Sequence, residues 1–226
     1  MMLTVVSDGE QMLTLPPWVL DFDSFLRWCD SDEFPEEGRI WFIRGGVWAD
    51  MTMEQVFSHN QVKGEMTRAL MTVVKMTKSG RFFPDGVRIT NLPAELSGVP
   101  DGTYVSFDTL RAGRARYVEG KGKDAGGYTQ LEGIPDIAIE VVSLSSVDKD
   151  TEWLQKAYWE VGIPEYWLID ARRLPLTFDL CRHSSKGYTA ARKSGGWVKS
   201  AVLGKSFRLS AATNGLGHPD YTLEVR

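Results

Sequence analysis

The residue whose chemistry stands out is Glu140, because it interrupts an almost wholly apolar segment that runs from Asp136 to Val142. The apolar residues of this segment are mostly β-branched, which is typical of a strand buried on both faces. A buried carboxylate is costly in free energy unless a cation or several hydrogen bonds meet it. The sequence therefore indicates a positive partner for Glu140. That partner could be a divalent metal ion, or an arginine such as Arg88 in a structural ion pair.

The spacing within the strand limits which acidic residues could share one ion with Glu140. Side chains alternate along a strand, so Asp136 and Glu140 lie on the same face. At a rise of ~3.3 Å per residue the two side chains are roughly 13 Å apart, too far to bind one ion together. We therefore expect Asp136 to be a strand-end or turn residue, and a second carboxylate would have to come from another strand.

The segment 133–170 that carries Glu140 predicts a strand, a turn, a helix and a second strand. Ser145 with Asp148 approximates a capping box at the start of the helix. Gly162, followed by Pro164, ends it. Because the two strands are joined by a helix through short turns, we expect them to be parallel. The apolar stripe of the predicted helix consists of Leu154, Ala157, Tyr158 and Val161.

The rest of the chain predicts further helices and strands around this unit. A short helix capped by Asp21 or Asp23 precedes a hairpin around Gly45-Gly46. A Gly-rich segment of mixed charge, 112–132, indicates a loop. The remaining expected elements are a long helix over 53–78, a strand pair or bent strand over 81–90, a strand over 103–110, antiparallel strands between 176 and 209, and peripheral tails at 1–19 and 211–226.

Composition sets broad limits on the class of protein. With 226 residues, 42% of them hydrophobic, the chain can bury a substantial core, and we expect one domain over 1–226 with its core at about 40–210. Two widely separated cysteines, Cys29 and Cys181, favour a reducing compartment. No apolar run approaches the length of a membrane span, so we expect a cytoplasmic protein. The net charge of −4 argues against tight binding of nucleic acid by bulk electrostatics. It leaves room for a metal-dependent nuclease, which needs acidic residues at its centre.

The order of predicted elements resembles the αβββαβ core of the PD-(D/E)XK nucleases, and more specifically the Uma-type restriction endonuclease family. The matching segments are PDIAIEVVSLSS at 135–146 and GIPEYWLID at 162–170. Further matches are Lys156 and Tyr158 in the helix, His59 near the start of the long helix, and Pro100-Asp101. The resemblance implies an α/β fold (an α+β mixed sheet) with a restriction-endonuclease-like αβββαβ core. The antiparallel C-terminal part would be an addition to it.

Two departures from the family pattern affect the expected chemistry. The hairpin has WFIRGGVWAD, whereas the family usually shows an acidic residue and a glycine there. Val142 stands where the superfamily motif has its lysine. The resemblance implies that the lysine then comes from the following helix, and Lys156, which flanks the apolar stripe, is the candidate.

The resemblance further implies the site and its partners. Asp101 and Glu140 would bind Mg²⁺ or Mn²⁺, Lys156 would be the third catalytic residue, and His59 would be accessory. The substrate would be DNA, cleaved at its phosphodiester bonds by a homodimer. Other interpretations stay open at this stage: His59 as a core histidine, and Lys156 as a surface lysine. The protein itself could be a catalytically degenerate binder of nucleic acid or of a protein, or an interaction protein with a buried ion pair.

Overall fold

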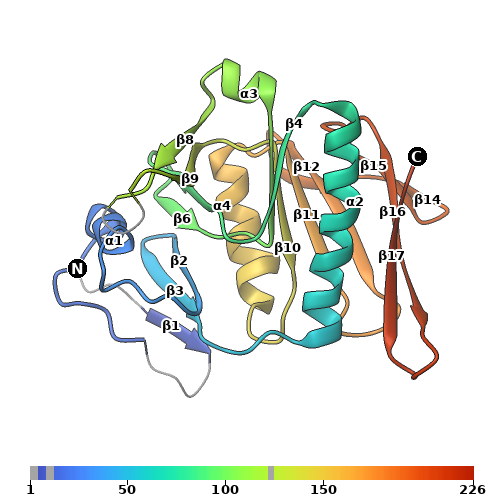
Figure 1. Ribbon diagram of the computed structural model, residues 1–226, viewed down its shortest axis with the longest axis horizontal. Helices are drawn as coiled ribbons and strands as arrows, with labels where there is room; N and C mark the ends of the chain where they lie inside the picture. The colour runs from blue at the N-terminus through green and yellow to red at the C-terminus, as the bar shows by residue number, and fades with distance from the viewer. Residues whose placement is uncertain (1–4, 9–12, 122–124) are drawn as a thin grey trace.

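The computed structural model describes residues 5–8, 13–121 and 125–226, and it is built around a central mixed sheet (Figure 1). The strand order in this sheet is β13-β12-β11-β10-β7-β4. Strands β10 and β11 are parallel, as predicted, and the other neighbours are antiparallel. The bounds are β4 Gly80–Pro84, β7 Gly102–Ser106, β10 Ile137–Val141, β11 Glu165–Asp170, β12 Thr177–Ser184 and β13 Gly187–Ala190.

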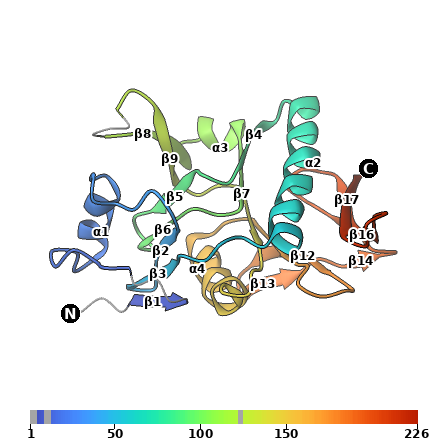
Figure 2. The same cartoon turned by 60° about the horizontal axis from the view of Figure 1, so that its bottom comes forward.

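Helices cover both faces of the central sheet, which explains why β10 is apolar at every position except Glu140 (Figure 2). Alternation directs Ile137, Ile139 and Val141 of β10 toward the cluster that contains helix α2, Val62–Thr77. Ala138 lies in the cluster on the opposite face, with helix α4, Leu154–Val161. Glu140 follows Ala138 on that same face, so its carboxylate is directed into the space between the sheet and α4.

Helices α1, α2 and α4 lie largely where the sequence predicts helices, whereas α3, Phe107–Arg111, forms in the second half of the segment 103–110 that the sequence predicts to be a strand. Asp21 caps α1 by accepting a hydrogen bond from the Ser24 backbone amide (2.8 Å). The capping box expected between Ser145 and Asp148 does not form in the described structure. Ser146 accepts from the Ser143 amide (2.9 Å), whereas Ser145 hydrogen-bonds the Asp50 carboxylate (2.5 Å). The other helical segments are α1 Phe22–Cys29, η1 Val56–Gln61, α3 Phe107–Arg111 and η3 Lys149–Trp153, where η1 and η3 are π-helical turns that lead into α2 and α4.

A second mixed sheet lies beside the central one, with the order β1-β3-β2-β6-β5-β9-β8. The predicted hairpin is confirmed as β2–β3, and its turn has left-handed backbone at Arg44 (φ 53°) and Gly45 (φ 78°). Trp41, Ile43 and Trp48 of this hairpin pack in one cluster with α4. The bounds are β1 Val5–Asp8, β2 Arg39–Ile43, β3 Gly46–Asp50, β5 Arg88–Asn91, β6 Leu96–Gly98, β8 Ala115–Glu119 and β9 Tyr128–Gly133.

Two predictions about this second sheet are wrong. Apart from 122–124, which lie outside the described residues, most of the expected loop 112–132 forms the antiparallel pair β8–β9, because Ala115 and Leu131 are buried and β9 also pairs with β5. The expected strand pair over 81–90 consists of strands in two different sheets. The left-handed residues Asp85 and Gly86 turn the chain from β4 in the central sheet to β5 in the second.

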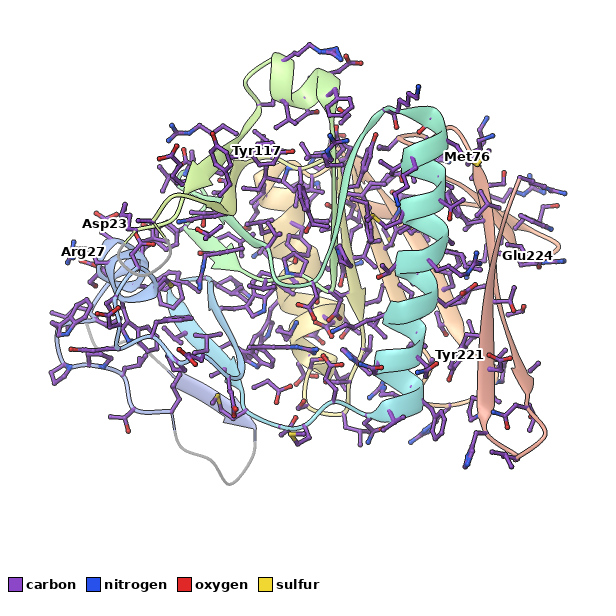
Figure 3. The ribbon with its side chains drawn as sticks, viewed as in Figure 1. Asp23, Arg27, Met76, Tyr117, Tyr221 and Glu224 are labelled. Carbon is purple, nitrogen blue, oxygen red and sulfur yellow. The ribbon has the colours of Figure 1, made fainter. Side chains whose placement is uncertain are left out.

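The C-terminal part forms a third, antiparallel sheet, as the predicted addition to the core requires. Residues 211–226, expected to be a peripheral tail, belong to its hairpin β16–β17. Tyr221 of β17 is buried in the same cluster as α2, and it lies between the two elements in Figure 3. The sheet contains β14 Lys193–Ser194, β15 Trp197–Lys199, β16 Ser206–Thr213 and β17 Pro219–Val225. In the part of the chain that the model describes, no helix has the length and apolar character needed to span a membrane.

Candidate active site

Asp101 and Glu140 lie side by side where β7 meets β10. The antiparallel register pairs Gly102 with Ile139, so the residue before β7 faces the residue after Ile139. The Asp101 Oδ2 atom accepts a hydrogen bond from the Val141 backbone amide at 2.8 Å. Both carboxylates are buried, with 8% of Asp101 and 2% of Glu140 exposed. The second carboxylate, which would share one ion with Glu140, thus comes from a neighbouring strand.

Basic side chains surround Asp101 on the side away from β10. His59 Nε2 lies 3.4 Å from Asp101 Oδ2, while Arg39 Nη2 and Lys63 Nζ lie 3.6 Å and 3.5 Å from Oδ1. Burial alone would raise the pKa of Asp101, but the hydrogen bond from His59 and the neighbouring positive charges outweigh it. The pKa of Asp101 therefore lies well below its usual range, and the side chain is ionised.

Glu140 has the opposite protonation behaviour. Its Oε1 atom accepts a hydrogen bond from the Tyr158 hydroxyl at 2.6 Å, and its Oε2 atom lies 3.3 Å from Lys149 Nζ. Burial raises the pKa of Glu140 to about 8, because the loss of hydration outweighs the attraction of the Lys149 ammonium. The negative charges of Asp150 and Asp101 act in the same direction. Two adjacent carboxyl groups with pKa values shifted apart are typical of sites that transfer protons or bind cations.

The cation that meets Glu140 is Lys149, the first residue of η3. Its side chain is 3% exposed, pairs with the Asp150 carboxylate, and lies near the indole rings of two hairpin residues. The Lys149 Nζ atom is 5.2 Å from the ring centroid of Trp41 and 4.9 Å from that of Trp48. Burial disfavours the ammonium, but the attraction of Asp150 and Glu140 is larger, and the pKa of Lys149 is raised. Lys149 is therefore a buried cation held by carboxylates and aromatic faces.

The structure does not bring Lys156, the lysine expected at the site, to Glu140. Its side chain is 53% exposed, and its ammonium lies 3.8 Å from the carboxylate of Glu160 on the outer face of α4. Lys149, about two helical turns earlier, occupies the expected place. Lys149 is not expected from the sequence because it stands in a polar turn that has the composition of an exposed helix start. The available signal was its position shortly after the carboxyl end of β10, where Glu140 lies.

His59 belongs to the Asp101 side of the site. It lies in η1, is 1% exposed, and its Nε2 atom contacts both Asp101 and Arg39 (3.2 Å to Nη1). The Nδ1 atom has no hydrogen-bond partner among the described residues and lies 3.5 Å from Glu54 Oε2. His59 thus connects the buried Asp101 to the more exposed Glu54.

Asp136 and Arg88, the other two residues discussed in relation to Glu140, make structural contacts elsewhere. Asp136 accepts hydrogen bonds from the Ser106 amide (2.6 Å) and the Thr109 hydroxyl (2.7 Å), and so stabilises the start of α3. Arg88, the arginine considered as a partner of Glu140, instead donates to Cys29 Sγ (2.9 Å) and lies over the Phe34 ring. The structural ion pair of Glu140 with Arg88 is therefore absent from the described part of the molecule.

The formal charges around the two carboxylates favour a cation. Three basic side chains and five carboxylates form two neighbouring ion-pair networks, one that includes Asp101 and one that includes Glu140. Each network has one carboxylate more than it has basic side chains when His59 is not counted. No group of three or more His, Cys, Asp or Glu residues is arranged as a metal cage in the described ranges. Mg²⁺ is commonly held by one or two carboxylates together with waters and substrate phosphates, so two adjacent carboxylates suffice as its protein ligands. The first network consists of Arg39, Glu54, Lys63, Asp85 and Asp101, and the second of Glu140, Lys149 and Asp150.

Comparisons with known proteins agree with this fold. The family model Uma2, described as "Putative restriction endonuclease", matches residues 22–211. A solved structure from Anabaena variabilis ATCC 29413, titled as a putative nuclease belonging to DUF820, is similar over 81% of this chain and 90% of that chain. The TM-score is 0.59 and the sequence identity is 20%, so this likeness shows the fold. A comparison with curated proteins gave no match.

Proposed function

This chain belongs to the Uma2 family of restriction-endonuclease-like proteins, and from that premise we propose that it hydrolyses DNA phosphodiester bonds with the help of a divalent metal ion. The observation that carries the proposal is the pair Asp101 and Glu140, brought together from two strands, each within an ion-pair network that has one carboxylate in excess. Asp101 and Glu140 would hold Mg²⁺ or Mn²⁺. When bound, the ion supplies Lewis-acid polarisation of the phosphate and a more acidic water.

The basic residues of the site have distinct parts in this proposal. Lys149 orients the Glu140 carboxylate and stabilises negative charge at the site, in the role first expected for Lys156. Arg39 and Lys63 are less buried, with 21% and 12% of their side chains exposed, and lie on the Asp101 side. They are the groups that would meet a substrate phosphate. His59 stays an accessory residue that holds Asp101 ionised.

Cleavage and binding assays with matched variants test the proposal. Cleavage of single- and double-stranded DNA is measured with Mg²⁺ or Mn²⁺, beside a binding titration in Ca²⁺. We expect Glu140→Gln and Lys149→Met to slow cleavage by about a hundredfold or more, with a much smaller effect on DNA affinity. The control Lys156→Met changes an exposed lysine on the same helix and should cleave as the wild type does. Equal cleavage by Glu140→Gln and wild type contradicts the proposal.

A second candidate function is that of a nuclease-fold protein that binds nucleic acid or a protein without cutting. It is favoured by the hydrogen bonds and ion pairs that already meet Asp101 and Glu140, and by Val142 in the motif position. This protein would bind DNA in Ca²⁺ yet cut no substrate with any metal. Calorimetry with Mn²⁺ separates the two functions further, because the enzyme requires binding that Glu140→Gln loses.

The proposal also includes a homodimer, as the family resemblance implies, and a cytoplasmic location, as the cysteine content favours. Analytical ultracentrifugation of the full chain, with and without DNA, measures the state of assembly. A monomer under both conditions would contradict the dimer and would leave the proposed chemistry unaffected, because Asp101, Glu140 and Lys149 all come from one chain.

A further inference from the structure

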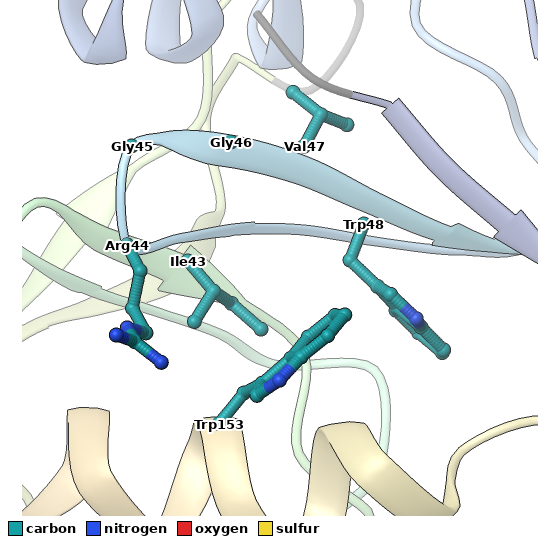
Figure 4. A pocket seen from close by; sticks show the side chains of 7 residues that line it. All are labelled: Ile43, Arg44, Gly45, Gly46, Val47, Trp48 and Trp153. Atoms are coloured by element: carbon teal, nitrogen blue, oxygen red, sulfur yellow. The ribbon is translucent and has the colours of Figure 1, made fainter.

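A pocket lies directly beside the candidate active site, between the tip of the β2–β3 hairpin and the start of the η3–α4 helix (Figure 4). Its volume is about 330 Å³, at the lower end of the range for small-molecule sites. It therefore has room for one small planar ligand and none for a duplex. The lining consists of Ile43, Arg44, Gly45, Gly46, Val47, Trp48 and Trp153.

The pocket offers aromatic surfaces from both of its walls. Figure 4 shows Trp153 directed from the helix toward the hairpin, and Ile43 and Trp48 directed from the hairpin toward the helix. Trp153 is only partly buried, so part of its ring is available to a ligand. Gly45 and Gly46 add no side chains at the tip. Indole faces are the surfaces on which nucleic-acid bases stack, whatever their sequence.

A free cation stands at the rim of the same pocket. Arg44 is exposed, and within the described part of the chain its guanidinium has no hydrogen bond or ion pair. Its left-handed backbone (φ 53°) forms the hairpin turn, and its side chain is directed toward the helix (Figure 4). A guanidinium can stack on a base and can also pair with a phosphate. An indole that stacks on the base and a guanidinium that pairs with the phosphate together fit one nucleotide.

The pocket shares a wall with the catalytic network. The Trp48 ring lines the pocket and also lies 4.9 Å from Lys149 Nζ, which contacts Glu140. Trp153 follows Lys149 by about one helical turn. A nucleotide in the pocket is therefore a neighbour of the carboxylates that would bind the metal.

We propose that this pocket binds an unpaired base of the nucleic-acid substrate, stacked on Trp153 with Arg44 at its open side. The inference rests on the proposed function, because the bound base belongs to the nucleic-acid substrate. That base would be turned out of the base stack of its nucleic-acid strand. It implies a preference for single-stranded or locally opened DNA over a fully paired duplex.

The test measures binding of a labelled single-stranded oligonucleotide, and of the same oligonucleotide with abasic sites, in Ca²⁺. We expect Trp153→Leu to weaken binding of the ordinary oligonucleotide by about tenfold and to leave binding of the abasic one unchanged. Trp159→Leu is the control, because Trp159 is on the same helix but outside the pocket, stacked on His183. Equal binding of the ordinary oligonucleotide by wild type and Trp153→Leu overturns the inference.

A second pair of variants keeps the test independent of any damage to the fold by Trp153→Leu. Arg44→Gln should weaken binding several-fold and lower the salt dependence of affinity by about one phosphate contact. Arg44→Lys should retain the salt dependence but lose part of the affinity, because the planar stacking surface is gone. The control Arg192→Gln removes the same charge from an exposed position outside the pocket. Equal effects of Arg44→Gln and Arg192→Gln contradict the inference.

Two further measurements separate this inference from the proposed function. If dAMP binds and is lost in Trp153→Leu while the oligonucleotide is unaffected, the pocket takes a free nucleotide and the substrate-base assignment is wrong. If both Trp153→Leu and Arg44→Gln weaken oligonucleotide binding but the wild type never cuts, the pocket stands and the nuclease proposal fails. If the wild type cuts DNA and neither variant changes binding, the nuclease proposal stands and the pocket inference fails.

Discussion

Replacement of Lys149 by methionine removes the cation at the centre of the buried network while it keeps the apolar stem of the side chain. Glu140 and Asp150 are then left without the ammonium that lies 3.3 Å from the first and pairs with the second. Removing one partner of a buried ion pair typically costs about 3–5 kcal/mol. We expect a loss of this size in the free energy of unfolding at pH 7.

The cost of protonating Asp150 in the variant gives a free-energy loss of the same size and shows how this loss depends on pH. The ordinary pKa of an aspartate is 3.8, and protonating such a group to keep it buried at pH 7 costs about 4 kcal/mol. By the same relation the cost at pH 5 is about 2 kcal/mol. Because the folded state of the variant has a raised pKa, its stability is greatest at low pH and is lost as the pH rises. The destabilisation should therefore be larger at pH 7 than at pH 5.

Urea unfolding in metal-free buffer at the two pH values measures these losses. The matched control is Lys156→Met, whose side chain is half exposed and pairs with Glu160 within one helix. Such a pair contributes about 0.5 kcal/mol or less. If Lys149→Met and Lys156→Met lose equal stability at pH 7, or if the Lys149→Met loss is the same at pH 5, the description of the buried network is wrong.

Three further predictions concern the carboxylates of the core. The Glu140 carboxyl has a folded pKa of about 8 against an ordinary 4.5, so its contribution to stability is complete below pH 4.5 and is lost as the pH rises to 8. Between pH 5 and 8 Glu140→Gln should therefore lose less stability than wild type, by up to about 4 kcal/mol, and parallel curves of urea-unfolding free energy against pH for the two proteins would refute this. Tyr158→Phe removes the 2.6 Å hydrogen bond to Glu140 and should cost about 1–3 kcal/mol in calorimetric stability, whereas a negligible change would mean that another donor replaces the hydroxyl. Glu165 of β11 is 1% exposed; it accepts from the Trp167 indole and also from a hydroxyl and two backbone amides in the segment between β15 and β16 of the C-terminal sheet. Glu165→Ala should therefore cost about 3 kcal/mol or more and raise hydrogen exchange in that sheet, while the exposed control Glu160→Ala should be near neutral.

The part of the site that could be predicted from the sequence depends on short-range geometry. The burial of Glu140 follows from its place in an apolar strand, and alternation correctly excluded Asp136 as its co-ligand. The pairing of β10 with a parallel β11 follows from the helix between them. Asp101 came from the family resemblance, because the register of β7 against β10 is a long-range contact that spacing alone does not determine.

Lys149 could not be chosen over Lys156 from the sequence for a reason that is also long-range. Both lysines belong to one helical segment, and in a regular α-helix residues seven apart lie on nearly the same face. The π-helical turn η3 changes this period, so that Lys149 faces the sheet and Lys156 faces solvent. The burial of Lys149 also requires Trp41 and Trp48, which come from a hairpin in another sheet about a hundred residues earlier.

The loop predicted over 112–132 has a similar explanation. Its Gly-rich, mixed-charge sequence has no clear period of apolar residues, and in the structure only Ala115 and Leu131 of β8 and β9 are buried. The strands form because β9 finds a partner in β5, so the pairing overrides weak local propensity.

The arrangement of the network explains how a valine can stand where the superfamily motif has a lysine. Val142 is on the same face of the strand as Glu140, and it is fully buried between the sheet and the helix. A lysine there would enter the space from the strand, whereas Lys149 enters the same space from the start of the helix and reaches Glu140 at 3.3 Å. The indole rings of Trp41 and Trp48 lie near the ammonium and limit its exchange with water. Under the proposed function, Lys149 therefore supplies from the helix the positive charge that a lysine at position 142 would supply from the strand.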